Sequence, residues 1–209
     1  ELKIDITLKE FYDYSKKEIH FYTVEANKFE LEDISYKTHP DLQLLTSLHM
    51  TCSIPLIFTP VFIDKKCYVD GGVINNYPVL YCLKRPNISN DEILGLTNIF
   101  SDEKDTNGIV KDINVLDYIS KLILKLIRGN ISTIHNSNYA QLKYEVLIKN
   151  SNLNVKDLYH ALSSSNERKR LFEDGIQSGI SFLNKHKNDH IVDNLPSNVS
   201  DILKEIREL

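Results

Sequence analysis

An aspartate followed by two glycines is the part of this chain whose residue types point to chemistry. Asp70 comes at the end of Cys67-Tyr68-Val69, a short run of strand-forming residues, and Gly71 and Gly72 follow it directly. Such a sequence cannot comfortably continue a strand, and glycine permits positive φ or the close approach of another backbone or a ligand. The pattern predicts a carboxylate at a strand-to-loop corner, where α/β enzymes hold catalytic groups. An isolated Asp-Gly-Gly more commonly caps a tight turn. The neighbouring residues therefore determine whether Asp70 is interpreted as a turn cap or as a catalytic group.

Two proline-containing segments flank the aspartate. Upstream, Ser53-Ile54-Pro55 opens an apolar stretch that cannot be helical through the proline. Downstream, Pro78 suits the first turn of a helix that continues through residues 79–83, with Asn75 or Asn76 available as its N-cap.

These blocks, in this order and spacing, resemble the patatin-like phospholipase family. The resemblance extends back through residues 7–11 and 20–27 and thins after about Phe100. It implies a carboxylic ester hydrolase that acts on lipids or phospholipids through a serine–aspartate dyad and needs no cofactor. In such a dyad a serine on a Gly-x-Ser-x-Gly elbow attacks the acyl carbonyl and the aspartate takes its proton. Asp70 matches this general base, and Gly71 and Gly72 match the rest of its motif.

The nucleophile half of that machinery is missing from the sequence. None of the seven glycines brackets a serine in the required pattern, and the nearest miss, Gly175-Ile176-Gln177-Ser178-Gly179, lies in a polar helical stretch. No glycine-rich cluster precedes Gly71 to form an oxyanion hole, and the sequence begins with Glu1. We therefore expect the C-terminal part of a longer polypeptide, inactive by itself, whose upstream half supplies the serine. The alternative is a catalytically inactive patatin-like module that binds lipid or a partner.

The histidines suggest other hydrolase classes. His135 or His160 could be the base of a serine-histidine-aspartate triad, but each is better explained as a surface or helix-face residue. His49, three residues before Cys52, is compatible with a nucleophilic cysteine–histidine pair, although the family resemblance assigns this stretch to packing behind the aspartate loop. No His-x-x-x-His or His-Glu-x-x-His spacing predicts a metal site.

Composition and charge limit the class of protein further. With 209 residues, of which 42% are hydrophobic and 26% charged, the chain can form one domain with a substantial core. A net charge of −4 gives no case for nucleic acid. The three cysteines form no Cys-x-x-Cys pair and predict reduced thiols, and no apolar run approaches the roughly 18 residues of a membrane span. We expect a cytoplasmic protein whose contact with membranes is at most peripheral.

The elements that must position Asp70 alternate between strand and helix, which predicts an α/β fold. The resemblance adds a mainly parallel sheet with helices on both faces and the aspartate at a strand's C-terminal edge. Thr7 and Glu10 predict a capping box at the start of a helix. Further expected elements are hairpin strands at 19–26 and 29–34, a helix at 41–50, a strand at 93–100, a surface loop at 101–108 and a late strand at 145–148.

Residues 112–128 predict an amphipathic helix with a basic polar face. Such a helix can lie on a lipid surface, but packing of its apolar stripe on the sheet explains the pattern better, because each buried Leu or Ile is worth roughly 1.5–3 kcal/mol. We assign residues 1–185 to the C-terminal part of a hydrolase domain. Residues 186–209 are assigned to a polar linker and a short terminal helix.

Overall fold

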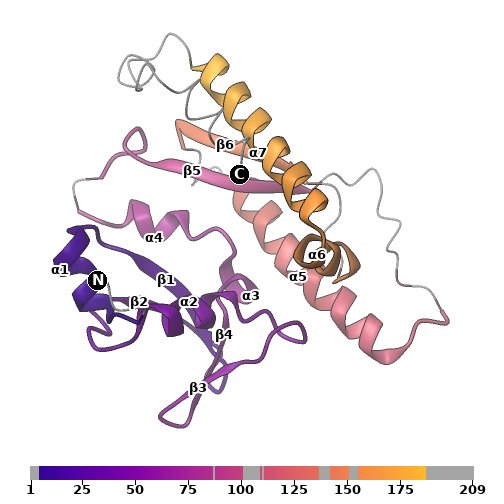
Figure 1. Cartoon of the computed structure of the whole chain (residues 1–209), viewed down its shortest axis with the longest axis horizontal. Coiled ribbons are helices and arrows are strands. Elements are labelled where there is room, and N and C mark those ends of the chain that lie inside the picture. Colours follow the sequence, from indigo (N-terminus) through magenta and orange to yellow (C-terminus); the bar gives the residue numbers. More distant parts are fainter. Residues whose placement is uncertain are drawn as a thin grey trace.

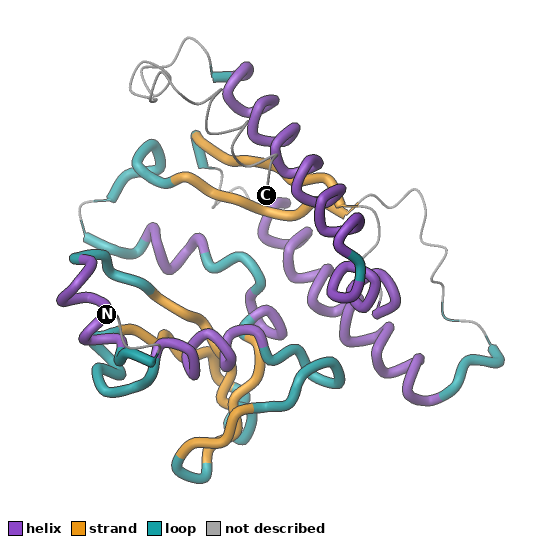
Figure 2. Tube along the Cα trace, viewed as in Figure 1, coloured by secondary structure: helices purple, strands orange, loops and turns teal. Residues whose placement is uncertain are grey.

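The computed structural model describes residues 5–86, 88–100, 109, 111–136, 142–150 and 155–186. These residues form an α/β fold with two sheets (Figures 1 and 2). The first sheet has the strand order β2-β1-β4-β3, and the second pairs β5 with β6. The strands are β1 (His20–Glu25), β2 (Glu30–Ser35), β3 (Val61–Ile63), β4 (Lys66–Asp70), β5 (Leu94–Phe100) and β6 (Tyr144–Asn150).

A mainly parallel sheet, as expected from the family resemblance, is not what the described residues form. All three pairings of the first sheet are antiparallel, and only β5 and β6 run parallel. For β1–β2 and β3–β4 the physical reason is the short connection, because a parallel pair needs a crossover of a dozen or more residues and an antiparallel pair does not. In the turn between β3 and β4, Asp64 and Lys65 both adopt left-handed backbone conformations, with φ of 48° and 66°. Consecutive residues of this kind are typical of a tight hairpin turn.

The helices agree with the sequence predictions at most positions. They are α1 (Leu8–Ser15), α2 (Leu44–Cys52), α3 (Gly72–Asn75), α4 (Val79–Leu83), α5 (Val115–Asn136), α6 (Val155–Ser163) and α7 (Ser165–Lys185). The capping box of α1 is confirmed, because Thr7 Oγ1 accepts from the Glu10 N–H at 3.1 Å and the Glu10 carboxylate accepts from the Thr7 N–H at 2.8 Å. Helix α2 begins three residues later than predicted and runs two residues further.

The predicted hairpin and the strands near residues 93–100 and 145–148 are confirmed as β1–β2, β5 and β6. Strand β3 was not predicted. The expected surface loop at 101–108 and terminal helix after residue 200 lie outside the described residues.

Helical segments contact both faces of the first sheet. On one face, Leu8 of α1 and Met50 of α2 form a buried core with Ile34 and Tyr68 of the sheet. On the opposite face, the ring of Tyr22 lies 5.2 Å from that of Tyr81 in α4. Because neighbouring residues of a strand point to opposite faces, β1 contributes to both layers.

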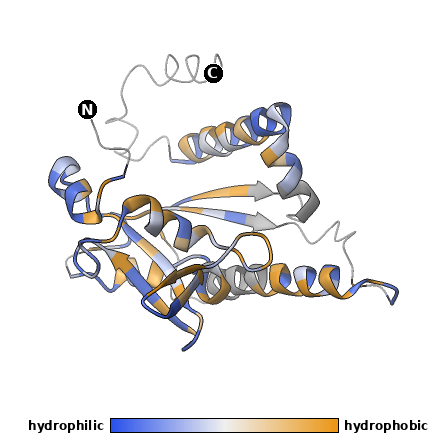
Figure 3. Cartoon of the chain, turned by 60° about the horizontal axis from the view of Figure 1, so that its bottom comes forward, coloured by the Kyte–Doolittle hydropathy of each residue, from blue (hydrophilic) through white to orange (hydrophobic). Residues whose placement is uncertain are grey.

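The second sheet lies between two helices (Figure 3). Helix α7 packs on β6, while α5 contacts α3. The prediction that the apolar stripe of α5 packs on a sheet is wrong for several residues, since Leu116 is 70% exposed and Leu126 is 60% exposed. Packing of α5 against α3 leaves these side chains without a sheet to cover them. Within the described part of the chain, no helix combines the length and apolarity needed to cross a membrane.

Candidate active site

Asp70 is the last residue of β4, and its backbone is held from two sides. It pairs with Thr23 of β1, and its N–H donates a 2.9 Å hydrogen bond to the Ser53 carbonyl. The Ser53 side chain is fully buried and donates to the His49 carbonyl at 2.7 Å. Ser53 therefore supports the backbone of the aspartate from behind.

Gly71 and Gly72 are required for space rather than for positive φ. Gly71 has an ordinary helical φ of −62°, and no described glycine adopts a positive φ, so that part of the expectation is wrong. A Cβ atom at Gly71 would collide with the Tyr22 carbonyl of β1. A Cβ atom at Gly72 would lie 2.9 Å from Asp70 Oδ1 and 2.5 Å from Asn76 Oδ1. The glycines allow the chain to turn back tightly beside the carboxylate.

The two oxygens of the Asp70 carboxylate differ in their surroundings. Oδ1 accepts a 2.6 Å hydrogen bond from the Gly72 N–H. Oδ2 makes no hydrogen bond within the described residues. Partial burial of the side chain raises the pKa of Asp70, and the Gly72 N–H opposes this by stabilising the ionised form. The result is an oriented carboxylate with one oxygen available and an increased affinity for a proton.

Asp70 borders a polar hollow with a volume of about 230 Å³. Its described lining residues are His20, Phe21, Tyr22, Thr51, Asp70, Gly71, Gly72, Asn75, Asn76 and Pro78, none of which is a serine. The hydroxyl of Thr51 donates to the Tyr22 carbonyl at 2.7 Å. The hollow therefore offers a base, but the described residues offer no nucleophilic serine beside it.

The predicted N-cap of the helix after Pro78 is wrong. Pro78 itself precedes α4 as the cap residue, and no side chain bonds there. Asn75 instead accepts from the Tyr77 N–H at 3.1 Å, which closes the turn between α3 and α4.

The other candidate catalytic residues that the structure describes do not line the hollow beside Asp70. His160 lies on α6, with a mostly exposed side chain 4.0 Å from Glu167, and the side chain of His135 lies outside the described residues. The residues from Gly175 to Gly179 belong to α7 and form no strand-to-helix elbow. No group of three metal-binding side chains occurs among the described residues.

Cys52 is poorly suited to nucleophilic attack. Burial, and then the negative charge of Asp70, raise the pKa of the Cys52 thiol. A thiol in these surroundings stays protonated, whereas a nucleophilic cysteine must be a thiolate.

His20 is a site residue that the sequence did not reveal. Its Nδ1 lies 2.7 Å from Asp33 of β2, and its Nε2 lies 2.6 Å from Glu18. The partners come from positions 13 residues later and two residues earlier. Asp33 reaches His20 only because β1 pairs with β2. The cluster of Glu18, His20 and Asp33 therefore has no characteristic spacing in the sequence.

Comparisons with known proteins agree with the resemblance. Residues 3–83 match the profile of the family described as patatin-like phospholipase. The protein named "Probable lipid hydrolase 463L" from Invertebrate iridescent virus 6 is 33% identical over 108 residues, which are 50% of this chain and 37% of that protein. Residues 3–83 are therefore similar to the patatin-like phospholipase family.

A solved structure shows a similar fold. The crystal structure of VipD from Legionella pneumophila matches with a TM-score of 0.53 and 15% sequence identity, over 87% of this chain and 35% of that one. At this identity the likeness concerns the fold alone. The chain thus spans little more than a third of the length of either relative.

Proposed function

We propose that the protein is a lipid acyl hydrolase in which Asp70 is the general base of a serine–aspartate dyad. The observation that carries the proposal is the Asp70 carboxylate, which has one oxygen fixed by the Gly72 N–H and the other available beside a hollow. The match of residues 3–83 to the patatin-like phospholipase profile supports the reaction class, and the name of the viral relative, a probable lipid hydrolase, supports the substrate class.

The proposed reaction uses the free carboxylate oxygen as a proton acceptor. A serine hydroxyl is a weak nucleophile and needs a base within about 2.6–3.2 Å. As the serine oxygen bonds to the acyl carbonyl, its proton moves to Asp70. Asp70 then returns the proton to the departing alcohol as the ester bond breaks. In the second half of the reaction, Asp70 takes a proton from the water that attacks the acyl-serine ester, and returns it to the serine oxygen as the fatty acid leaves. A raised pKa favours this role because it makes the carboxylate a stronger base.

We place the serine and the oxyanion donors outside this sequence. The support is that no Gly-x-Ser-x-Gly segment occurs in it and that no serine is found among the described residues lining the hollow. An oxyanion hole is usually the largest catalytic contribution, with a single donor worth about 10²–10³ in rate. We therefore expect residues 1–209 alone to be inactive.

The reaction class can be tested with the complete natural polypeptide and vesicles of phosphatidylcholine and phosphatidylglycerol. We expect release of free fatty acid that is blocked by a serine-directed organophosphonate. Peptide mapping should locate the adduct on a serine outside residues 1–209. Binding to vesicles without acyl release would contradict the proposal and favour the inactive lipid-binding alternative.

A further inference from the structure

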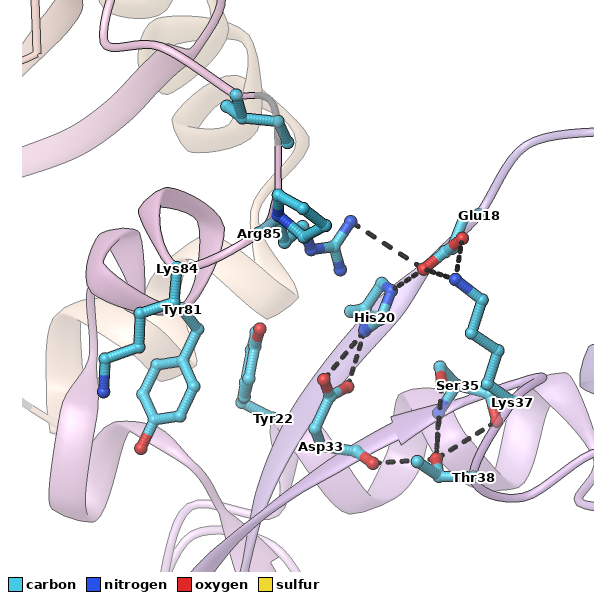
Figure 4. A pocket seen from close by; sticks show the side chains of 12 residues that line it. Glu18, His20, Tyr22, Asp33, Ser35, Lys37, Thr38, Tyr81, Lys84 and Arg85 are labelled. Carbon is cyan, nitrogen blue, oxygen red and sulfur yellow. Dashed lines mark hydrogen bonds and ion pairs between the residues drawn. The ribbon is translucent and has the colours of Figure 1, made fainter.

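Strand β1, the neighbour of β4, is tied to the surrounding elements by its own side chains. His20 lies 2.7 Å from Asp33 of β2 and 2.6 Å from Glu18, and its ring is turned toward both carboxylates (Figure 4). Two residues further along, the Tyr22 ring lies 5.2 Å from the ring of Tyr81 in α4. These contacts fix the position of β1 around Tyr22, so elements that pack on its backbone are fixed with it.

The carbonyl of Tyr22 contacts two parts of the candidate active site. It lies just past the last pair of β1 with β4 and accepts a 2.7 Å hydrogen bond from the Thr51 hydroxyl of α2. The backbone of Gly71 lies against the same carbonyl, because a Cβ atom there would collide with its oxygen. Gly71 connects Asp70 to Gly72, whose N–H holds the Asp70 carboxylate. The turn that orients the carboxylate therefore packs on a carbonyl whose direction Thr51 fixes.

Thr51 differs from the other residues that hold this corner. Thr23 is fully buried and donates to the Val69 carbonyl at 2.7 Å, and Ser53 accepts from the Asp70 N–H. Both act on β4 before the turn begins. Of these three residues, only Thr51 lines the hollow beside Asp70. Its hydrogen bond acts on the carbonyl that the turn itself packs against.

We propose that Thr51 is a positioning residue for Asp70 and acts through the Tyr22 carbonyl and the Gly71 backbone. A threonine hydroxyl has one proton to donate, and here the Tyr22 carbonyl receives it. Removal of the hydroxyl frees this carbonyl to rotate, and the closely packed Gly71 must then move with it. A shift of about 1 Å in a catalytic group can cost roughly 10² in rate. The effect on hydrolysis rests on the proposed function, whereas the effect on the turn does not.

Hydrogen exchange of the complete polypeptide, read by mass spectrometry, tests the effect on the turn without measuring hydrolysis. The informative peptide contains residues 70–75, whose N–H groups at Gly72 and Asn75 donate within the turn. Thr51→Val keeps the shape of the side chain and removes the hydroxyl. We expect this variant to exchange about three- to tenfold faster than the wild type in this peptide. Thr51→Ser keeps the hydroxyl and should exchange as the wild type does, and peptides of α7 should be unchanged in both variants.

The kinetics of acyl release test the role in the reaction. We expect Thr51→Val to lower kcat about tenfold or more while KM changes little, and Thr51→Ser to retain wild-type kcat. Thr38→Val is the matched control, because the Thr38 hydroxyl donates to the Asp33 carbonyl at 2.8 Å and does not line the hollow. It should leave both kcat and the exchange of the turn unchanged. If circular dichroism shows that Thr51→Val is unfolded, Thr51→Ala makes the same comparison.

The outcomes separate the role of Thr51 from the proposed function. Exchange of the turn at the wild-type rate in Thr51→Val, or a uniform increase over the whole chain, would overturn the positioning role. Wild-type kcat in a variant whose turn exchanges faster would overturn it as well. Absence of acyl release by the wild type would contradict the hydrolase proposal alone, and the exchange of the turn would then decide the role of Thr51.

Discussion

The Gly72 N–H donates a 2.6 Å hydrogen bond to the carboxylate of Asp70, two residues earlier in the chain. This bond fixes the orientation of the side chain at the end of β4. It also explains the second glycine, because a Cβ atom at Gly72 would press against the same Asp70 oxygen. Burial and this N–H act on the proton affinity of Asp70 in opposite directions, and burial has the larger effect.

The first prediction concerns the pH dependence of hydrolysis. A general base must be ionised, so kcat/KM of the complete protein should fall as the pH drops through the pKa of Asp70. Because burial raises this pKa, the acid limb should lie above the ordinary aspartate value of about 3.9. The pH–rate profile measures this directly. An acid limb at or below the ordinary value would contradict the assigned environment.

The second prediction concerns stability. A carboxyl with a raised pKa in the folded state favours folding when protonated, and that contribution is lost as the pH rises through the folded pKa. Ionised Asp70 therefore opposes folding at neutral pH, while Asn keeps the Oδ1 acceptor for the Gly72 N–H. We expect Asp70→Asn to be at least as stable as the wild type at about pH 8. Its advantage should shrink as the pH falls toward about 4. Urea titration at both pH values measures this, and a clear loss of stability at the higher pH would be inconsistent with it.

The third prediction tests the close approach at Gly71. Gly71→Ala would place a methyl group against the Tyr22 backbone, which cannot move without distorting β1. We expect a loss of about 1–3 kcal/mol in the free energy of unfolding. Gly175→Ala on α7 is the matched control, because a Cβ atom there meets nothing within 4 Å. It should stabilise the helix by about 0.5–1 kcal/mol, and equal effects of the two substitutions would exclude the steric explanation.

The fourth prediction tests the contact between the segment after Asp70 and the second sheet. The Tyr77 hydroxyl donates to Glu145 of β6 at 2.7 Å, and both burial and this carboxylate raise the pKa of the phenol. Tyr77→Phe should cost about 1.5–3 kcal/mol, as expected for a hydrogen bond to a charged group. Tyr14→Phe, at a side chain that is 73% exposed, should change little. Chemical denaturation of both variants makes the comparison, and similar small effects would show that this bond contributes no stability.

Local sequence signals predicted the corner at Asp70 and the elements around it. The capping box at Thr7 and the apolar run at β5 depend on neighbouring residues only, and both are confirmed. The antiparallel β1–β2 hairpin was predicted from the sequence, but the antiparallel pairing of β1 with β4 joins distant segments and could not be obtained from the alternation of strands and helices. The family resemblance implied a mainly parallel sheet and so did not predict these antiparallel pairings either.

The remaining site features depend on contacts between distant residues. Gly95 interrupts an apolar strand in the sequence, and the structure shows that it makes room for the Tyr77 hydroxyl and Leu142. The His20 cluster requires strand pairing, and the space beside Gly71 is defined by a carbonyl of β1. None of these contacts leaves a periodic or spaced pattern in the chain.

The most direct test of the central claim is acyl release by the complete polypeptide with Asp70→Asn. Asp64→Asn is the matched control, because Asp64 is an exposed residue in the β3–β4 turn and asparagine tolerates its left-handed conformation. We predict that Asp70→Asn lowers kcat/KM by about 10²–10⁴, the usual contribution of a general base, while Asp64→Asn retains wild-type activity. A folded Asp70→Asn protein with wild-type activity would contradict the assignment of Asp70 as the catalytic base.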